Sequence, residues 1–373
     1  GAGDGDNIKV VGQYPVTILG VGGADDIRGG SGADLIIGAG GSDTIDGYIG
    51  DDIIEGGEGS DVLSGGYGND TLAGESGHDT LIGGVGDDLI SGGHGIDAAV
   101  FAGSQADYQF ASSPDGLTIY VTDANNNYVD TITGVESLRF DDGDIGVSQD
   151  ANGMVLTGSN GPDSIQVVGS IPITIEAGSG DDTIQGDTIN DLIFGQDGDD
   201  IIDGNAGDDV ITGGAGDDTI DGGDDTDIAI FAGNQADYTF ESSTDGLTIT
   251  ITDTVNNDVD TVTGVETLRF DDGDITVSHD TSLNQLVLTG DTTGDNITIV
   301  GSVPVTVYGD EGDNIITGGS GDDTIEAGTG DDTIDGGDGT DVGIFNGDKQ
   351  DFTFSVASDG TLTVTDTNSA TSL

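Results

Sequence analysis

The sequence has no cysteine, no tryptophan and only five basic residues among 373. Without cysteine, disulfides and thiolate metal sites are excluded. Against the five basic residues stand 73 acidic ones, which gives a formal net charge of −68 at pH 7. Such a surface repels phosphate groups, so we expect no nucleic-acid partner and no binding to an anionic membrane. No apolar run approaches the roughly 20 residues of a spanning helix, so membrane insertion is not expected either.

Glycine, by contrast, is abundant and follows a period of nine residues. Nine blocks occupy Gly20–Val100, six occupy Ala177–Ile230 and four occupy Gly309–Ile344. Position 6 of the block is Asp in 18 of the 19 blocks, position 4 is Gly in 17, and position 8 is Ile or Leu in 16. Low hydrophobicity with high charge normally favours disorder, but a period this strict indicates a repeat fold instead.

Each block predicts one tight turn followed by one very short strand. Glycine tolerates the positive φ angles and close backbone approach that the first half, GGxGx, requires. The second half directs a single apolar side chain inward from a short strand. Two blocks would make one coil with a strand on each side, and successive coils would stack at about 4.8 Å. We therefore expect an all-β fold of tandem parallel β-rolls with a thin core of isoleucine and leucine.

The position-6 aspartates predict metal sites between stacked coils. Stacking places the carboxylate of one block beside that of the next block but one, with turn carbonyls between them. Such a column of carboxylates repels itself at neutral pH unless a cation neutralises it. A cage made of oxygen atoms suits Ca²⁺ better than Mg²⁺, which demands stricter geometry, or Zn²⁺ and copper, which prefer His and Cys. If each ion needs two stacked turns, the three runs would hold roughly 13 calcium ions.

The pattern GGxGxDxUx, where U is Ile or Leu, resembles the RTX (repeats-in-toxin) calcium-binding repeat. The resemblance covers the three runs and implies a β-roll whose ligands are position-6 side chains and carbonyl oxygens of the glycine turns. The implied side-chain ligands are Asp25, Asp34, Asp43, Asp52, Asp61, Asp70, Asp79, Asp88, Asp97, Asp182, Asp191, Asp200, Asp209, Asp218, Asp227, Asn314, Asp323, Asp332 and Asp341. Asn314 is neutral and is expected to be a weaker ligand. Ile189 and Asp225 replace the position-4 glycine, so a local departure in turn geometry is expected there.

Different segments precede and follow each run. After the first two runs come near-copies that begin FAGSQADY and FAGNQADY, and their alternating strands and Asp-Gly turns predict small antiparallel β caps with an aromatic core. Such caps would cover the open strand edges of a roll. Each run is preceded by a lead-in with an x-Pro strand, at residues 5–18, 161–175 and 294–307. We expect this lead-in to form a calcium-free first coil.

Lead-in, roll and cap thus recur three times along the chain. The expected domains are residues 1–160 with a roll at 20–100, residues 161–293 with a roll at 177–230, and residues 294–373 with a roll at 309–344 and a truncated cap. Whole nonapeptides can be added to a roll without disturbing either end, as in other stacked repeats. Both ends of the sequence are expected to continue into a longer array.

No pattern in the sequence predicts catalysis. His78, His94 and His279 are the only histidines, and we expect none of them to be catalytic. There is no nucleophile elbow or zincin motif. Neighbouring carboxylates could imitate a glycosidase pair, but calcium ligation and solvated turns account for them. Glu136 and Arg139, which recur at matching positions in the second cap, are expected to form an ion pair.

These observations favour a structural role. The resemblance implies a bacterial protein that leaves the cell by type I secretion and folds outside it, where calcium is millimolar. We expect a segment of a surface adhesin, surface layer or extracellular filament, with copies of itself or cell-surface glycans as further partners. Two alternatives stay open: a C-terminal RTX module of a secreted protease, lipase or alginate epimerase, and a carbohydrate-binding module.

Overall fold

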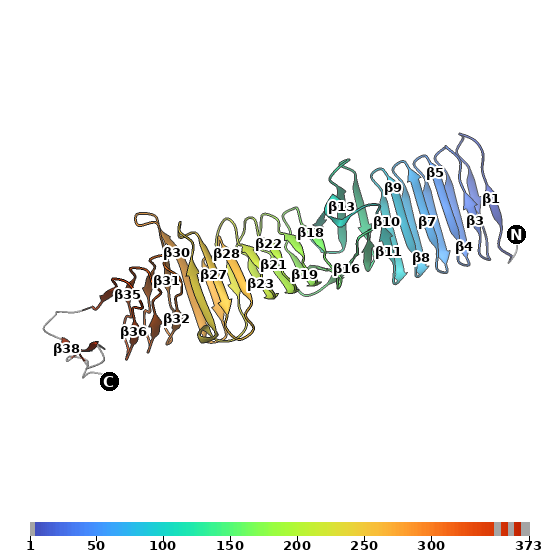
Figure 1. Ribbon diagram of the computed structural model, residues 1–373. Helices are drawn as coiled ribbons and strands as arrows, with labels where there is room; N and C mark the ends of the chain where they lie inside the picture. The colour runs from blue at the N-terminus through green and yellow to red at the C-terminus, as the bar shows by residue number, and fades with distance from the viewer. Residues whose placement is uncertain (1–3, 347–351, 357–361, 367–373) are drawn as a thin grey trace. The chain divides into compact units, whose positions relative to one another are not determined.

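The structure is a computed structural model that describes residues 4–346, 352–356 and 362–366 (Figure 1). Short β-strands make up nearly all of its regular structure, and these residues contain no α-helix. Two 3₁₀ helices are present, η1 (Gln105–Asp107) and η2 (Gln235–Asp237). The prediction of an all-β fold is therefore confirmed. The chain divides into two compact units, residues 1–233 with 248–271 and residues 234–247 with 272–373.

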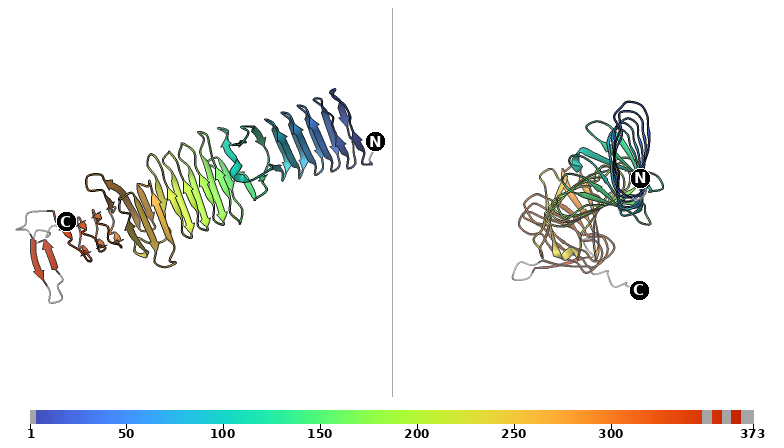
Figure 2. Two further views of the ribbon diagram at one scale, coloured as in Figure 1. Left: turned by 45° about the horizontal axis from the view of Figure 1, so that its top comes forward. Right: turned by 90° about the vertical axis from the view of Figure 1, so that its right-hand side faces the viewer.

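In the first unit, the nine blocks of the first run wind into a parallel β-roll with one strand per block (Figures 1 and 2). Strands of alternate blocks pair in parallel, so Ile27 lies opposite Ile45 and Ile36 lies opposite Ile54. One ladder contains β1 (Asn7–Lys9), β3 (Asp26–Arg28), β5 (Thr44–Ile49), β7 (Val62–Tyr67), β9 (Thr80–Val85) and β11 (Ala98–Val100). The opposite ladder contains β2 (Thr17–Leu19), β4 (Leu35–Gly40), β6 (Ile53–Glu58), β8 (Thr71–Gly77) and β10 (Leu89–Gly95). The 18-residue coil expected from the period is confirmed.

The core of this roll is a single file of apolar side chains from position 8. From Ile27 to Ile90 these side chains are at most 1% exposed, and Ala99 ends the file with no exposure. Position 7 on the same strands faces outward, as at Ile53 and Leu89, which are each 47% exposed. One buried side chain per strand is a small core, so the stability of each coil depends strongly on its neighbours and its turns.

The first cap continues the roll. Its strand β14 (Val129–Thr133) pairs in parallel with β10, and β15 (Ser137–Arg139) pairs in parallel with β11. Antiparallel partners are then added on both sides, as predicted: β12 (Tyr108–Ser112) and β13 (Thr118–Asp123) beside β14, and β16 (Asp144–Gln149) and β17 (Met154–Thr157) beside β15. Phe101, Tyr108, Phe110 and Phe140 pack together with ring centroids 5.2–6.0 Å apart. The cap therefore has the expected aromatic core, but it extends both ladders instead of only covering them.

The second roll starts on the first cap within the same unit. Strand β17 pairs in parallel with β19 (Ile173–Ser179). The same ladder of parallel strands continues through β21 (Leu192–Asp197), β23 (Val210–Ala215), β25 (Ile228–Ile230) and β29 (Thr267–Phe270). The opposite ladder contains β18 (Ser164–Gln166), β20 (Thr183–Gln185), β22 (Ile201–Asp203), β24 (Thr219–Asp221) and β28 (Val259–Thr263), with β27 (Thr248–Asp253) antiparallel to β28. Hydrogen-bonded strands thus connect the first roll, the first cap and the second roll.

The second unit contains the third lead-in and the third roll. It begins with η2 and β26 (Tyr238–Ser242), followed by the hairpin of β30 (Gly273–Asp280) and β31 (Gln285–Thr289). One parallel ladder contains β31, β33 (Thr306–Tyr308), β35 (Thr324–Glu326) and β37 (Val342–Ile344). The other contains β32 (Asn296–Thr298), β34 (Ile315–Thr317) and β36 (Thr333–Asp335). The hairpin of β38 (Phe352–Val356) and β39 (Leu362–Asp366) belongs to the expected third cap, much of which lies outside the described residues.

The single-file core predicts a large difference between adjacent residues of one strand. Leu63 is fully buried, whereas its neighbour Val62 is 40% exposed. We expect Leu63→Ala to lower the free energy of unfolding by about 2–5 kcal/mol, because it leaves a cavity in the file. Val62→Ala, the control, should have a much smaller effect. Urea unfolding at saturating calcium measures both, and equal effects would contradict the single-file core.

Candidate metal centre

The position-6 side chains form buried columns along the turns. In the first run, Asp25 to Asp97 are each no more than 2% exposed. One carboxylate oxygen, Oδ1, accepts a hydrogen bond from the backbone N–H of the position-6 residue one coil earlier. The Asp25 N–H donates to Asp43 at 2.7 Å, and the Asp34 N–H donates to Asp52 at 2.7 Å. Each aspartate therefore holds its turn in register with the turn before it.

The other carboxylate oxygen, Oδ2, is buried and has no hydrogen-bond partner among the described residues in most of these turns. The aspartates with this property are Asp25, Asp43, Asp52, Asp61, Asp70, Asp79, Asp88 and Asp97 in the first run, and Asp182, Asp200, Asp209, Asp218 and Asp227 in the second. A buried carboxylate oxygen without a donor or a cation is costly. The repetition of this arrangement indicates that a ligand belongs beside these atoms.

The surroundings of Oδ2 are those of an oxygen cage. A Cβ added to Gly38 would lie 2.3 Å from Asp43 Oδ2 and 2.7 Å from the carbonyl oxygen of Gly56 in the next coil. The same pair of oxygens recurs at Gly47, where Asp52 Oδ2 and the Gly65 carbonyl lie 2.5 and 2.8 Å from the added atom. Because the position-1 residue is glycine, there is space beside it. The Oδ2 atom of the same block and a glycine carbonyl oxygen of the next coil both face that space. Such all-oxygen surroundings fit a hard cation of calcium size.

Asn314 shows which atoms converge at this place. Its Oδ1 accepts the Asp295 N–H at 2.8 Å, as an aspartate would. Its Nδ2 stands where the other turns have Oδ2, and donates to the carbonyl oxygens of Ala327 at 2.9 Å and Gly312 at 3.2 Å. The amide thus satisfies two carbonyls with its own hydrogens, whereas an aspartate would require a cation or a proton there.

The remaining position-6 residues depart from this pattern. Asp332 and Asp341, near the end of the third run, are only half-buried. At Asp34, Asp191 and Asp323, by contrast, Oδ2 accepts a backbone N–H from the same turn at 2.8–3.0 Å. The predicted position-6 set is therefore brought into columns, but its members do not all have the same surroundings.

Burial raises the pKa of the column carboxylates. It raises the pKa of Asp52 and Asp61 to about 6 and that of Asp70 to about 7, from an ordinary value of 3.8. The backbone N–H donors oppose this rise, and neighbouring carboxylates add to it, as Asp88 and Asp52 do for Asp70. Without a cation, part of each column would thus be protonated near neutral pH.

Each of the first two caps extends both aspartate columns. The Asp88 N–H donates to Asp130 Oδ1 at 2.8 Å, and the Asp97 N–H donates to Glu136 Oε2 at 2.8 Å. In the second cap Asp260 and Glu266 accept the N–H groups of Asp218 and Asp227 in the same way. Sequence reasoning missed these carboxylates because they are 42 and 39 residues from their partners, outside the period of nine.

The predicted ion pair of Glu136 with Arg139 is replaced by two other interactions. Glu136 points to the roll, where it binds the Asp97 backbone, and Arg139 Nε lies 3.6 Å from Asp144 Oδ2 on the neighbouring strand. The short distance in sequence between Glu136 and Arg139 suggested an ion pair between them. The Glu136 carboxylate instead accepts the backbone N–H of Asp97 in the adjacent turn of the roll.

Position 5 carries a second ladder that the sequence analysis overlooked. The Asn69 N–H donates to Asp51 Oδ1 at 3.0 Å, and the Asp87 N–H donates to Asn69 Oδ1 at 3.1 Å. His78 belongs to this ladder, since its Nδ1 accepts the Ile96 N–H at 2.9 Å. The signal was present in the sequence, because position 5 is Ser, Thr, Asp, Asn or His in 16 of the 19 blocks.

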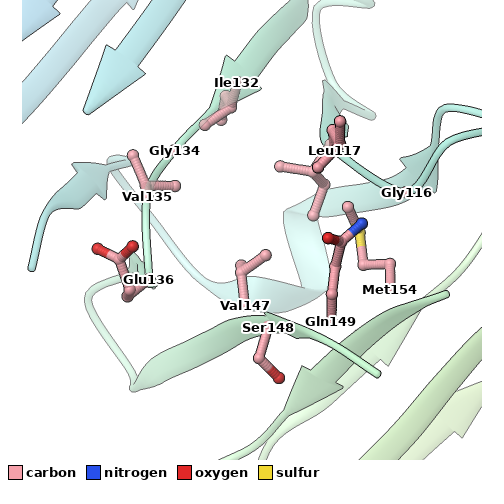
Figure 3. A pocket seen from close by; sticks show the side chains of 11 residues that line it. Gly116, Leu117, Ile132, Gly134, Val135, Glu136, Val147, Ser148, Gln149 and Met154 are labelled. Carbon is pink, nitrogen blue, oxygen red and sulfur yellow. The ribbon is translucent and has the colours of Figure 1, made fainter. Parts of the chain in front are cut away.

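A pocket of about 220 Å³ lies in the first cap (Figure 3). Leu117, Val147 and Met154 are among its apolar lining residues. Glu136, its one carboxylate, is held by the Asp97 N–H. Among all described residues, no group of three or more His, Cys, Asp or Glu side chains gathers as a metal ligand set, so a cation in the turns would depend on carbonyl oxygens as well.

Fold and site together define a parallel β-solenoid whose turns are suited to hard cations. A family model for the RTX calcium-binding nonapeptide repeat matches the chain at residues 19–54, 28–63, 46–81, 64–98, 176–211, 194–238 and 308–342. The three runs of nonapeptides are thus RTX calcium-binding nonapeptide repeats. The predicted family and the tandem β-roll fold are both confirmed, and the repeats are calcium-binding repeats.

Comparison with curated proteins gave no match. Among solved structures, the chain is similar to the extracellular lipase LipA from Serratia marcescens, with 24% sequence identity and a TM-score of 0.25. The match covers 57% of this chain and 38% of the lipase chain. The chain thus spans well under half the length of that lipase. No helix in the described part of the chain is both long and apolar enough to cross a bilayer.

The raised pKa values predict that protons can replace the cation in part. Folding raises the pKa of Asp70 from 3.8 to about 7, so the folded column binds more protons than the unfolded chain between these values. The resulting stability is complete below the unfolded pKa and is lost as the pH rises through the folded pKa. In a chelator, the chain should therefore gain β-structure on acidification from about pH 7.5 to about pH 5. Far-UV circular dichroism tests this, and an identical spectrum at both pH values would contradict it.

Proposed function

We propose that this chain is a structural segment of a secreted adhesin, surface layer or extracellular filament, which calcium folds and stiffens, and that it is not itself an enzyme. One observation carries the proposal: in the first compact unit, strand pairing passes from β11 to β15, through β16 and β17, and on to β19. The two rolls and the cap between them thus form one hydrogen-bonded stack. The C-terminal module of an enzyme would need only one capped roll. A continuous stack of rolls is instead suited to a long, stiff support.

The charge of the chain explains why calcium would control its stiffness. With a formal charge of −68 and buried carboxylate columns, the metal-free chain repels itself and remains expanded at neutral pH. An expanded chain suits passage through a type I secretion channel from a cytosol that is low in calcium. Outside the cell, millimolar calcium would load the turns, so the free energy of binding becomes free energy of folding. Roughly 13 ions, as estimated from stacked turns, would leave a strongly acidic surface.

Calcium should therefore drive folding. In a chelator at neutral pH, we expect little β-structure in the far-UV circular dichroism spectrum and a large radius of gyration in X-ray scattering. Millimolar calcium should restore the β signal and contract the chain, because loaded turns remove the repulsion within each column. The same concentration of magnesium is the control and should do much less, since Mg²⁺ prefers stricter octahedral geometry. A chain that is equally folded with and without calcium would contradict the mechanism.

The structural role can be tested by pulling single molecules from their two ends. In calcium, we expect unfolding in discrete steps at well-defined forces, because whole rolls and caps resist extension together. In a chelator the same molecule should extend smoothly like a flexible polymer. If the two force–extension curves coincide, calcium does not stiffen the chain. The secreted-enzyme alternative would instead be favoured by a catalytic module elsewhere in the same gene product.

A further inference from the structure

We propose that the position-6 aspartates are of two kinds, and that Asp34, Asp191 and Asp323 take a backbone amide in place of calcium. Each of them lies in the second block of its run, beside the proline-containing lead-in coil. Each roll would then begin with a turn on its proline side that needs no metal, and calcium would bind only in the other turns. The inference rests on the proposed calcium binding, but it can fail while that proposal holds.

Backbone conformation separates the two kinds of turn without exception in the 19 blocks. In 16 blocks, both position 2 and position 4 have a left-handed φ, for example Ala39 at 80° and Gly41 at 132°. We call these open turns. In the blocks of Asp34, Asp191 and Asp323, neither position has a left-handed φ. We call these closed turns. The same difference occurs once in each of the three runs.

The closed conformation points the position-2 N–H at the carboxylate. Gly30 donates to Asp34 Oδ2 at 2.8 Å, and Gly319 donates to Asp323 Oδ2 at 3.0 Å. Asp187 donates to Asp191 Oδ2 at 2.8 Å. This oxygen is the counterpart of the one that has no partner in the open turns of the first two rolls. A backbone donor therefore occupies the position that calcium would otherwise fill.

At Asp34 the other carboxylate oxygen has a protein donor as well, and so has one carbonyl of the lead-in coil. Asp34 Oδ1 accepts the Val16 N–H at 2.9 Å. The Gly12 carbonyl of the lead-in accepts both the N–H and the hydroxyl of Ser31, at 2.8 and 2.9 Å. Calcium needs oxygen ligands, and both carboxylate oxygens of Asp34 already accept hydrogen bonds from backbone amides.

The other two rolls show the same hydroxyl contact. Ser320 Oγ donates to the Gly301 carbonyl at 2.9 Å, and Thr188 Oγ1 donates to the Gly169 carbonyl at 3.4 Å. The three closed turns thus share the position-2 donor to Oδ2 and the position-3 hydroxyl contact with the lead-in coil. A lead-in N–H also reaches Oδ1 of Asp34 and Asp323, whereas Asp191 Oδ1 is buried without a hydrogen-bond partner among the described residues.

The lead-in proline accounts for where the closed turns occur. Proline fixes its own φ near −65° and restricts the residue before it, so the lead-in cannot form an open turn like those of the roll. The closed turn lies directly against it, since a Cβ on Gly32 would be 2.8 Å from the Pro15 nitrogen. A Cβ on Gly321 would be 2.8 Å from the Pro304 nitrogen. The first turn that stacks on the lead-in therefore adapts to a partner without the open geometry.

Ile189 supports this division. It replaces the position-4 glycine in the closed turn of Asp191, where no left-handed φ is required. A β-branched residue is strongly disfavoured in the left-handed region. Asp225 also replaces a position-4 glycine, but in an open turn, and it adopts φ of 83°. Aspartate tolerates that region far better than isoleucine does, so each substitution agrees with the kind of turn in which it occurs.

Bound calcium per chain tests the proposal with two matched triple variants. The closed-turn variant is Asp34→Asn, Asp191→Asn and Asp323→Asn. The open-turn variant changes the next block of each run: Asp43→Asn, Asp200→Asn and Asp332→Asn. Equilibrium dialysis against calcium, followed by atomic emission, gives the number of ions. We expect the closed-turn variant to bind as many ions as the unmodified chain, and the open-turn variant to bind fewer.

Equal loss of calcium in both variants would overturn the inference while leaving calcium binding intact. If the unmodified chain bound no calcium, the proposed function itself would fail. Because Asn removes an acceptor from the closed turn, that variant can be too unstable to fold. Crystals of the unmodified, calcium-loaded chain then decide the matter. Anomalous difference density is expected beside Asp43 and not beside Asp34, and density beside Asp34 would overturn the inference.

Discussion

The second carboxylate oxygen of the buried position-6 aspartates is the atom on which the roll depends, because it lies beside carbonyl oxygens and needs a positive partner. The first oxygen already holds the preceding turn through a backbone N–H. Whatever satisfies the second therefore decides whether two coils remain stacked. A cation, a proton, the amide of Asn314 and the backbone N–H of a closed turn are four solutions to the same electrostatic problem.

This requirement also explains why the caps belong to the rolls. A column that simply stopped at Asp88 and Asp97 would leave their N–H groups without acceptors, and buried donors of this kind cost about 1–3 kcal/mol each. Asp130 and Glu136 supply these acceptors from a cap whose strands already continue the ladders. Turn electrostatics and strand pairing thus lead to the same continuous stack. Stiffness in such a stack is transmitted from coil to neighbouring coil.

The repeat period was enough to predict the fold, the file of position-8 side chains and the aspartate columns, because each follows from stacking every 18 residues. The cap carboxylates could not be found in this way, since Asp130 and Glu136 lie off the period. Closed turns were hidden for a different reason. Asp34 has the same neighbours in its block as many other aspartates, and its surroundings are set by Pro15 in the coil beneath. Position 5 did carry a visible signal, since it is polar in most blocks. Its side chains were interpreted as solvated surface, whereas several of them accept backbone N–H groups from the next coil.

An acidic solenoid has to begin somewhere, and the proline side of the lead-in coil offers a start that does not depend on metal. The turn of Asp34 has the turn of Asp52 on one side, but on the other side it has a lead-in coil without the open geometry. An N–H from the same turn takes the place of the ion there. The carboxylate of Asp34 then remains satisfied at calcium concentrations too low to load the turn of Asp43. Later coils can add to this start one at a time as calcium rises, which is how a one-dimensional stack grows.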